Sequence, residues 1–109
     1  LEIGLGPCKR VPGASLKLWQ ELLPNAKLWV AEYDAECVKH AQDEHGKIYG
    51  ATPLIGDQSN RTDLRLWIQN SGGKFDAIID DGGHHNKQIL TSFEELWPTV
   101  VPGGIYLIE

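Results

Sequence analysis

Methionine is absent from the 109-residue sequence, and no apolar run approaches the roughly 18 residues that a membrane-spanning helix needs. No basic start followed by an apolar stretch marks a signal peptide at Leu1. Because translation starts at methionine, we expect Leu1 to lie inside a longer protein, of which this chain is a fragment or trimmed domain. The sequence argues against a membrane protein.

Cysteine is scarce as well, since Cys8 and Cys37 are the two cysteines of the chain. Their spacing is unlike that of metal-binding cysteines, and two thiols do not suggest a disulfide framework. We therefore expect free thiols in a reducing compartment, which we take to be the cytoplasm.

Basic residues are in the minority. The chain has 10 Lys and Arg against 15 Asp and Glu, a formal net charge of -5, and Lys9-Arg10 is the one adjacent basic pair. Nucleic-acid binders usually carry a basic patch, so we expect no nucleic-acid partner. A small neutral or cationic ligand is compatible with this charge.

The rest of the composition is ordinary for a globular domain, with 41% hydrophobic and 23% charged residues. This composition excludes a disordered tail, a collagen-like repeat and a coiled coil. The length allows one domain, residues 1–109.

Short apolar runs alternate with amphipathic stretches, a pattern typical of an α/β fold with a parallel sheet. The patterns predict strands at residues 1–5, 27–32, 53–55, 75–79 and 105–108, and helices at 14–23, 34–45, 62–69 and 87–97. We expect Gly46 to end the second helix and residues 102–104 to turn the chain into the last strand. In the last helix one apolar stripe is expected to face the sheet, namely Ile89, Leu90, Phe93, Leu96 and Trp97.

Right-handed crossovers would place helices on both faces of this sheet, and ligands bind such sheets at the carboxyl ends of the strands. The first strand leads into Glu2-x-Gly4-x-Gly6, where glycines allow a tight turn close to a ligand. A dinucleotide-binding motif would have a third glycine at position 9, which is Lys9. The loop is either a cofactor-binding turn or a structural connection.

Polar side chains also follow the second and third strands. Glu32 ends the second strand, where an acid can accept hydrogen bonds from both hydroxyls of a ribose. Asp34 is expected to cap the next helix. After the third strand, Asp57 and Gln58 are suited to holding the exocyclic amine of an adenine, although a plain polar turn is the alternative.

The segment from Asp80 to His85, after the fourth strand, combines two carboxylates, two glycines and two histidines. Adjacent carboxylates repel each other unless a cation or hydrogen-bond donors offset their charge, and Mg²⁺ prefers oxygen ligands. A nearby histidine suits a general base near neutrality. The alternative is a polar turn with exposed histidines.

With these motifs the chain resembles a class I S-adenosylmethionine-dependent methyltransferase, and most of all the macrocin O-methyltransferase group, whose members methylate sugar hydroxyls of natural products. The resemblance is carried by residues 2–6, Glu32, Asp57 with Gln58, residues 75–84 and residues 102–109. It covers essentially the whole chain. It implies a Rossmann-like parallel sheet, truncated after the first five of the usual seven strands, in a single S-adenosylmethionine-binding domain.

The resemblance also implies roles for individual residues. Those that would bind the cofactor are Glu2, Gly4, Gly6, Glu32, Asp57, Gln58 and Asp80. Asp81 would bind Mg²⁺ and His84 would act as the base, and a further metal-binding acid would fall beyond Glu109. Cys8 stands where the group usually has glycine, and Gly83 where serine is common.

Three functions stay open at this point. The first is a methyltransferase acting on a small-molecule hydroxyl, assisted by Mg²⁺ and a histidine base. The second is a nicotinamide-dinucleotide-binding domain of an oxidoreductase, against which the missing third glycine and the acid pair count. The third is a non-catalytic scaffold of the same fold. The methyl acceptor and the oligomeric state do not follow from the sequence.

Overall fold

The computed structural model describes residues 1–8 and 10–109, except for the side chains of residues 44–47. Lys9, where the dinucleotide motif breaks off, thus lies outside the described residues. In chain order the elements are β1 (Glu2–Ile3), α1 (Ala14–Leu22), β2 (Trp29–Glu32), α2 (Ala35–Tyr49), β3 (Thr52–Ile55), α3 (Arg61–Ser71), β4 (Phe75–Asp80), α4 (Asn86–Leu96), a 3₁₀ turn (Trp97–Thr99) and β5 (Val100–Ile108).

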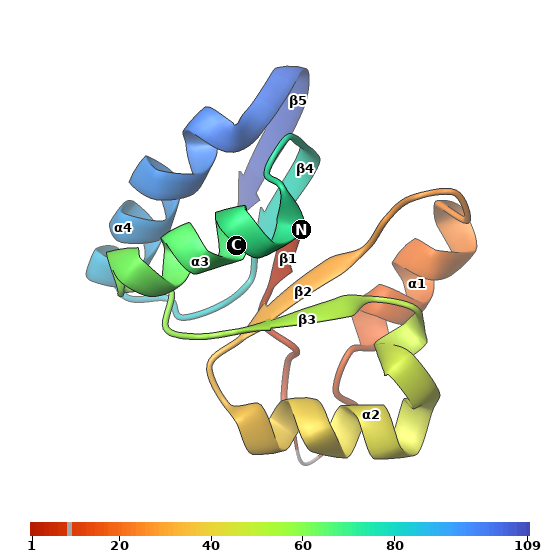
Figure 1. Cartoon of the computed structure of the whole chain (residues 1–109). Coiled ribbons are helices and arrows are strands. Elements are labelled where there is room, and N and C mark those ends of the chain that lie inside the picture. The colour runs from red at the N-terminus through yellow and green to blue at the C-terminus, as the bar shows by residue number, and fades with distance from the viewer. Residues whose placement is uncertain (9) are drawn as a thin grey trace.

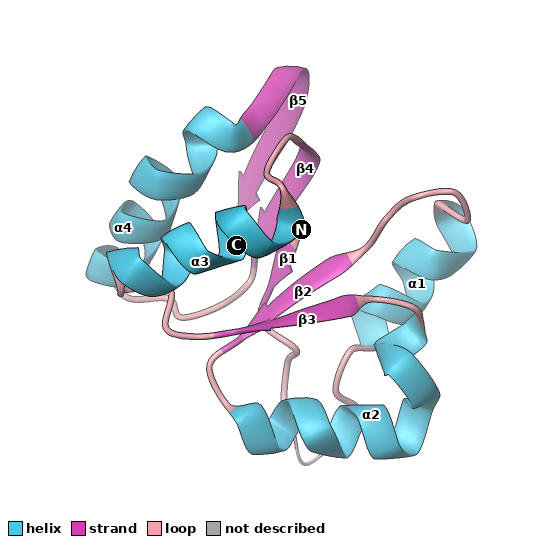
Figure 2. Ribbon diagram, in the orientation of Figure 1, coloured by secondary structure: helices cyan, strands magenta, loops and turns pink. Residues whose placement is uncertain are grey.

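The strands form one parallel sheet in the order β3-β2-β1-β4-β5. Figures 1 and 2 show α1 and α2 on one side of this sheet and α3 and α4 on the other. The chain moves outward from β1 to β3, returns to β4 beside β1, and then moves outward to β5. Right-handed crossovers in the two directions place their helices on opposite faces. The prediction of a Rossmann-like α/β fold with helices on both faces is confirmed.

Each face of the sheet has its own apolar cluster. The face under α3 and α4 is filled by Ile3, Ala31, Leu54, Leu64, Trp67, Phe75, Ile78 and Leu96. The face under α1 and α2 is filled by Leu5, Leu16, Val30, Cys37, Val38, Ala41, Ile48 and Ala51. Neighbouring strand residues such as Val30 and Ala31 enter different clusters because side chains alternate along a strand.

The start of α2 is set by a side-chain cap, whereas its end is set by packing against the core. At its start Asp34 accepts hydrogen bonds from two main-chain N–H groups of the first turn, at 2.9 and 3.3 Å, so the predicted cap is confirmed. At its end the helix continues to Tyr49, past the predicted stop at Gly46. The additional turn brings Ile48 into the cluster under α1 and α2, where it is fully buried.

Residues 102–104, predicted as a turn before the last strand, lie inside β5. Phe75 of β4 pairs with Val100, and Ala77 pairs with Ile105, so β5 carries three additional residues in this interval. The proline and two glycines therefore form a bulge in the strand, which is a known position for these residues in sheets.

The predicted apolar stripe of α4 is partly wrong. Leu96 is buried, but Leu90 is 58% exposed and Trp97 is 49% exposed. The polar Ser92 is fully buried instead. The helix is rotated so that the Ser92 hydroxyl reaches the carboxylate of Asp80, at 2.8 Å, beneath the end of β4.

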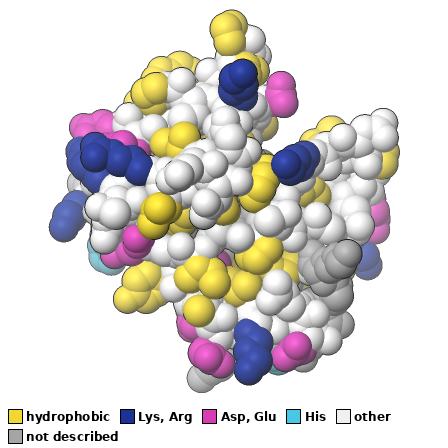
Figure 3. Space-filling view, in the orientation of Figure 1, with side chains coloured by type: hydrophobic (Ala, Val, Ile, Leu, Met, Phe, Trp, Pro, Cys, Tyr) yellow, Lys and Arg dark blue, Asp and Glu magenta, His cyan; other side chains and the backbone are white. Residues whose placement is uncertain are grey.

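Figure 3 shows the molecule hollowed between β4–β5 and α1, with acidic and basic side chains interspersed over the surface in view. A cavity of about 210 Å³ lies between α1 and the strands, with walls that are mostly apolar. Ile105 and Leu107 of β5 line it and are each about half exposed. Over the described part of the chain, every helix is too short or too polar to cross a membrane.

Candidate cofactor and active site

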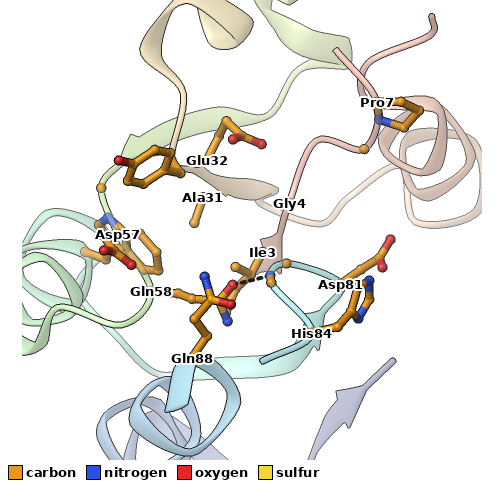
Figure 4. A pocket seen from close by; sticks show the side chains of 16 residues that line it. Ile3, Gly4, Pro7, Ala31, Glu32, Asp57, Gln58, Asp81, His84 and Gln88 are labelled. Atoms are coloured by element: carbon orange, nitrogen blue, oxygen red, sulfur yellow. Dashed lines mark hydrogen bonds between the residues drawn. The ribbon is translucent and has the colours of Figure 1, made fainter. Parts of the chain in front are cut away.

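A cavity of about 680 Å³ lies at the carboxyl ends of β1 to β4. The chain reverses its direction across the sheet between β1 and β4, and such switch points are the usual ligand sites of parallel sheets. Seven of the nine predicted site residues line it, namely Gly4, Gly6, Glu32, Asp57, Gln58, Asp81 and His84. Figure 4 shows Glu32 and Asp57 on one side, and Asp81 with His84 on the other.

The loops after β1 and β4 touch backbone to backbone at the floor of this cavity. Gly4 has a φ of +98°, and a Cβ atom there would lie 2.3 Å from the main-chain oxygen of Asp81. The Asp81 N–H in turn donates to the Ile3 oxygen at 3.0 Å. Glycine is required at position 4 because a side chain would separate the two loops.

Glu32 holds the end of β2 in place with its carboxylate. Its Oε2 atom accepts a hydrogen bond from the Leu5 N–H at 2.9 Å, and Oε1 accepts one from the Asp34 N–H at 3.0 Å. A carboxylate oxygen can accept more than one hydrogen bond, so both oxygens keep capacity for a ligand's hydroxyl groups. The side chain is oriented toward the cavity before any ligand arrives.

Asp57 is fixed by the turn that follows β3. Its Oδ1 atom accepts hydrogen bonds from the N–H and the hydroxyl of Ser59, at 2.7 and 2.8 Å. Its own N–H donates to Oδ2 of Asp63, at 2.9 Å. The carboxylate is therefore both a structural part of the turn and a wall of the cavity.

Asp80, predicted to bind the cofactor, does not line the cavity and is 2% exposed. Its carboxylate accepts hydrogen bonds from the Ser92 hydroxyl at 2.8 Å and from the Tyr106 hydroxyl at 3.3 Å. Burial raises the pKa of Tyr106 above its ordinary value, so its hydroxyl stays protonated and donates. Strand residues alternate in direction, so Asp81 faces the cavity while Asp80 faces α4.

Glu2, the other predicted cofactor residue outside the cavity, is also buried, at 5% exposure. Its carboxylate accepts hydrogen bonds from the Ser15 hydroxyl and from Nε1 of Trp19, the latter at 2.7 Å. Burial raises the pKa of the Glu2 carboxyl, while the hydrogen bonds from Ser15 and Trp19 lower it by less. Glu2 therefore joins β1 to α1.

Asp81 and His84 both line the cavity, Asp81 partly buried and His84 exposed. Nδ1 of His84 lies 3.1 Å from the main-chain oxygen of Glu109, which follows β5. Among the described residues no three His, Cys, Asp or Glu side chains gather as they would around a metal ion. The one carboxylate of Asp81 nevertheless fits Mg²⁺, which binds through one or two carboxylates and keeps several waters.

Cys8 and Cys37 are joined by a disulfide, which corrects the prediction of free thiols. Cys8 lies in the loop after β1, and Cys37 lies in the first turn of α2, which follows β2. Their Cα atoms are 5.4 Å apart because β1 and β2 are neighbours and end at the same edge of the sheet. The bond connects the loop after β1 to the first turn of α2.

The lining residues that were not predicted from the sequence include Tyr33, Trp67 and Gln88. Tyr33 directly follows Glu32 and is 75% exposed. Gln88 rises from α4 into the cavity in Figure 4, and its Oε1 is buried without a hydrogen-bond partner among the described residues. The available signal was the spacing of Gln88 and Ser92, which puts two polar residues on one face of α4.

The chain matches no family model. Over its whole length it is 35% identical to demethylmacrocin O-methyltransferase of Streptomyces fradiae and 35% identical to mycinamicin VI 2''-O-methyltransferase of Micromonospora griseorubida. It spans about a quarter of the length of these relatives, 26% in both cases.

Solved structures give the same relationship. The MycE methyltransferase of the mycinamycin biosynthetic pathway, in complex with Mg and SAH, matches 99% of this chain with a TM-score of 0.80 and 35% identity, over 28% of its own length. A second MycE complex, which also contains mycinamycin VI, matches with a TM-score of 0.81 and 32% identity, over 26% of its length. Over its whole length, this chain is thus similar in sequence to a part of these O-methyltransferases and has the fold of the corresponding part of the MycE structure.

Proposed function

We propose that the protein containing this chain is an S-adenosylmethionine-dependent methyltransferase that methylates a hydroxyl of a small molecule, most specifically a sugar hydroxyl of a natural product. The observation that carries the proposal is the meeting of four strand ends, each with suitable polar groups, around one cavity of about 680 Å³. This volume lies in the range of small-molecule sites, roughly 300–1,000 Å³. The names of the relatives support the same chemistry.

In this proposal residues 1–109 are the cofactor-binding part of a single methyltransferase domain. The carboxylate of Glu32 accepts hydrogen bonds from the ribose hydroxyls, and Asp57 accepts one from the adenine amine. The turn at Gly4 and Gly6 brings main-chain groups close to the methionine end. Glu2 and Asp80 support the site from the core, since both carboxylates are bound within the protein.

The reacting end of the site is assigned to Asp81 and His84. Methyl transfer is an in-line displacement in which the acceptor oxygen must lose its proton, so positioning and proton removal are the main tasks. When bound at Asp81, Mg²⁺ would lower the pKa of a coordinated hydroxyl. His84 is placed to take the proton of the acceptor hydroxyl on Nε2, because its Nδ1 faces the oxygen of Glu109. The acceptor enters from the open side next to His84, which is exposed.

The two other functions are less well supported. A nicotinamide-binding oxidoreductase would share the fold and the ribose acid, but the relatives over the whole chain are named O-methyltransferases. A non-catalytic scaffold would have no need for polar side chains from four strand ends around one cavity. A cytoplasmic location, a small-molecule partner and the lack of a nucleic-acid partner stay predictions.

Calorimetry on the protein that contains this sequence tests the proposal. S-adenosylhomocysteine is expected to bind with a micromolar dissociation constant, and NAD at the same concentrations is not. A folded protein that binds NAD and ignores S-adenosylhomocysteine would establish the oxidoreductase instead. A folded protein that binds neither ligand would support the non-catalytic scaffold.

A further inference from the structure

Gln58 occupies an unusual position for a residue of a ligand cavity. It lies in the turn after β3, lines the cavity, and is only 6% exposed. Both ends of its amide are already bound within the protein. Oε1 accepts a hydrogen bond of 2.6 Å from the N–H of Gly83, and Nε2 donates to Oδ1 of Asp80 at 3.1 Å. These two bonds fix the orientation of the buried amide within the protein.

These two bonds hold the loop after β4 on both sides of Asp81. Asp80 precedes Asp81 in the chain, and Gly83 precedes His84. Figure 4 shows Gln58 beneath this loop, with the bond from its amide to the loop drawn as a dashed line. A single side chain from another strand end thus fixes the main chain that carries Asp81 and His84.

The loop is pressed directly onto the Gln58 side chain. A Cβ atom at Gly82 would lie 2.1 Å from Oε1 of Gln58, so glycine at position 82 is what permits the contact. The carboxylate of Asp80 is in turn held by Ser92 of α4 and Tyr106 of β5. Gln58 links this buried network to the loop that faces the cavity.

The hydrogen-bond partners of residue 58 require an amide side chain. One end must donate to a carboxylate while the other accepts from a main-chain N–H, and both must be satisfied because the site is buried. Glutamate has no donor for Asp80, and methionine has neither a strong donor nor a strong acceptor. An amide of this length is the natural side chain that does both here.

We infer that Gln58 is a positioning residue for methyl transfer, which holds Asp81 and His84 in place, and not a direct contact to the cofactor. This inference rests on the proposed function. It replaces the predicted role of Gln58 in adenine binding by a role in the geometry of the reacting end. The residue next to it, Asp57, keeps the role of contacting the adenine.

Replacing Gln58 by methionine in the protein that contains this sequence tests the inference. With Q58M we expect kcat to fall at least tenfold, while the dissociation constant of S-adenosylhomocysteine, measured by calorimetry, changes less than threefold. Q69M, at an exposed position on α3, is the matched control and should leave both unchanged. A tenfold weaker affinity with unchanged kcat at saturation would make Gln58 a cofactor contact and overturn the inference, and so would unchanged values of both.

A second measurement does not depend on activity. Hydrogen exchange at the amide of Gly83 should become at least tenfold faster in Q58M, because its acceptor is lost. If Q58M fails to fold, G82A provides the same test, since the new Cβ atom displaces the Gln58 amide while the side chain remains. Unprotected Gly83 in the wild type would refute the inference, whereas failure of the wild type to bind S-adenosylhomocysteine would refute the proposed function.

Discussion

Nδ1 of His84, a residue of the cavity wall, lies 3.1 Å from the main-chain oxygen of Glu109. That oxygen can only accept a hydrogen bond, so Nδ1 carries the proton of the neutral ring, and Nε2 keeps its lone pair. The chain just beyond β5 thereby sets which nitrogen of His84 can receive a proton.

His84→Ala should lower kcat by roughly 10²- to 10⁴-fold, the usual contribution of a general base, and leave the affinity for S-adenosylhomocysteine nearly unchanged. His85→Ala is the matched control, because His85 is the exposed next residue and makes no side-chain cap bond to the described part of α4. Steady-state kinetics and calorimetry on both variants decide the matter. Equal turnover in the two variants would remove His84 from the mechanism.

Asp81→Asn should abolish any dependence of turnover on Mg²⁺, because it removes the carboxylate charge that faces the cavity. We expect at least a tenfold loss of kcat at saturating Mg²⁺. Asp76→Asn is the control, since Asp76 is an exposed carboxylate on the same strand, β4. The measurement is turnover during Mg²⁺ titration of chelator-treated protein. A D81N protein with the wild-type titration curve would contradict the assignment.

Gly4→Ala should destabilise the protein by roughly 3 kcal/mol, because it combines a left-handed backbone with a clash against the Asp81 oxygen at 2.3 Å. Gly72→Ala has a similar φ of +82° but no described atom within 4 Å of the new Cβ, so about 1–2 kcal/mol is expected. Urea unfolding of both variants measures the difference. Equal losses would show that the clash is relieved without cost.

Glu2→Gln should stabilise the protein at neutral pH. The pKa of Glu2 is raised in the folded state, chiefly by burial. At a pH below the pKa of the unfolded state, both states are protonated and no effect arises. As the pH rises through the interval up to the raised pKa, the unfolded state loses its proton first, so the free energy of unfolding falls.

Unfolding measured from pH 4 to pH 8 should therefore show a decline in the wild type that is reduced in E2Q. Glutamine can still accept from Trp19 and can donate to Ser15, so the packing is kept. Glu21→Gln, at an exposed position on α1, should leave the pH profile as it is. Parallel profiles for wild type and E2Q would contradict the raised pKa.

Reduction of the Cys8–Cys37 bond should lower the free energy of unfolding by roughly 3–4 kcal/mol, the chain-entropy value for cysteines 29 residues apart. Cys8→Ser should show the same loss and no further response to reductant. Unfolding with and without dithiothreitol, together with a thiol count, measures both. Two titrating thiols in the untreated protein would restore the expectation of free thiols.

Much of the site could be predicted from the sequence, because short apolar runs place the strand ends and the polar residues directly after them. Glu32, Asp57 and Asp81 were found in this way, and all three line the cavity. The sequence alone does not show the direction in which each side chain points. Asp80 and Asp81 look equivalent in the sequence, but the pleat of β4 sends one to α4 and the other to the cavity.

The remaining differences come from contacts between segments far apart in the chain. The pairing of Cys8 with Cys37 depends on β1 and β2 being neighbours. The binding of Gln58 to Gly83 depends on how close the turns after β3 and β4 come. Helix periodicity likewise misplaced Leu90, because a buried Ser92 outweighed the apolar pattern.

The sheet order has a consequence for how the chain acquires its structure during synthesis. β1 is two residues long and lies between β2 and β4, where Glu2 pairs with both Val30 and Ile79. During synthesis β1 therefore lacks one of its two neighbours until β4 has been made. Pairings of such long sequence separation form late and slowly. The central strand β1, and the loop that follows it, should therefore become fully protected from hydrogen exchange only after β4 has paired with β1.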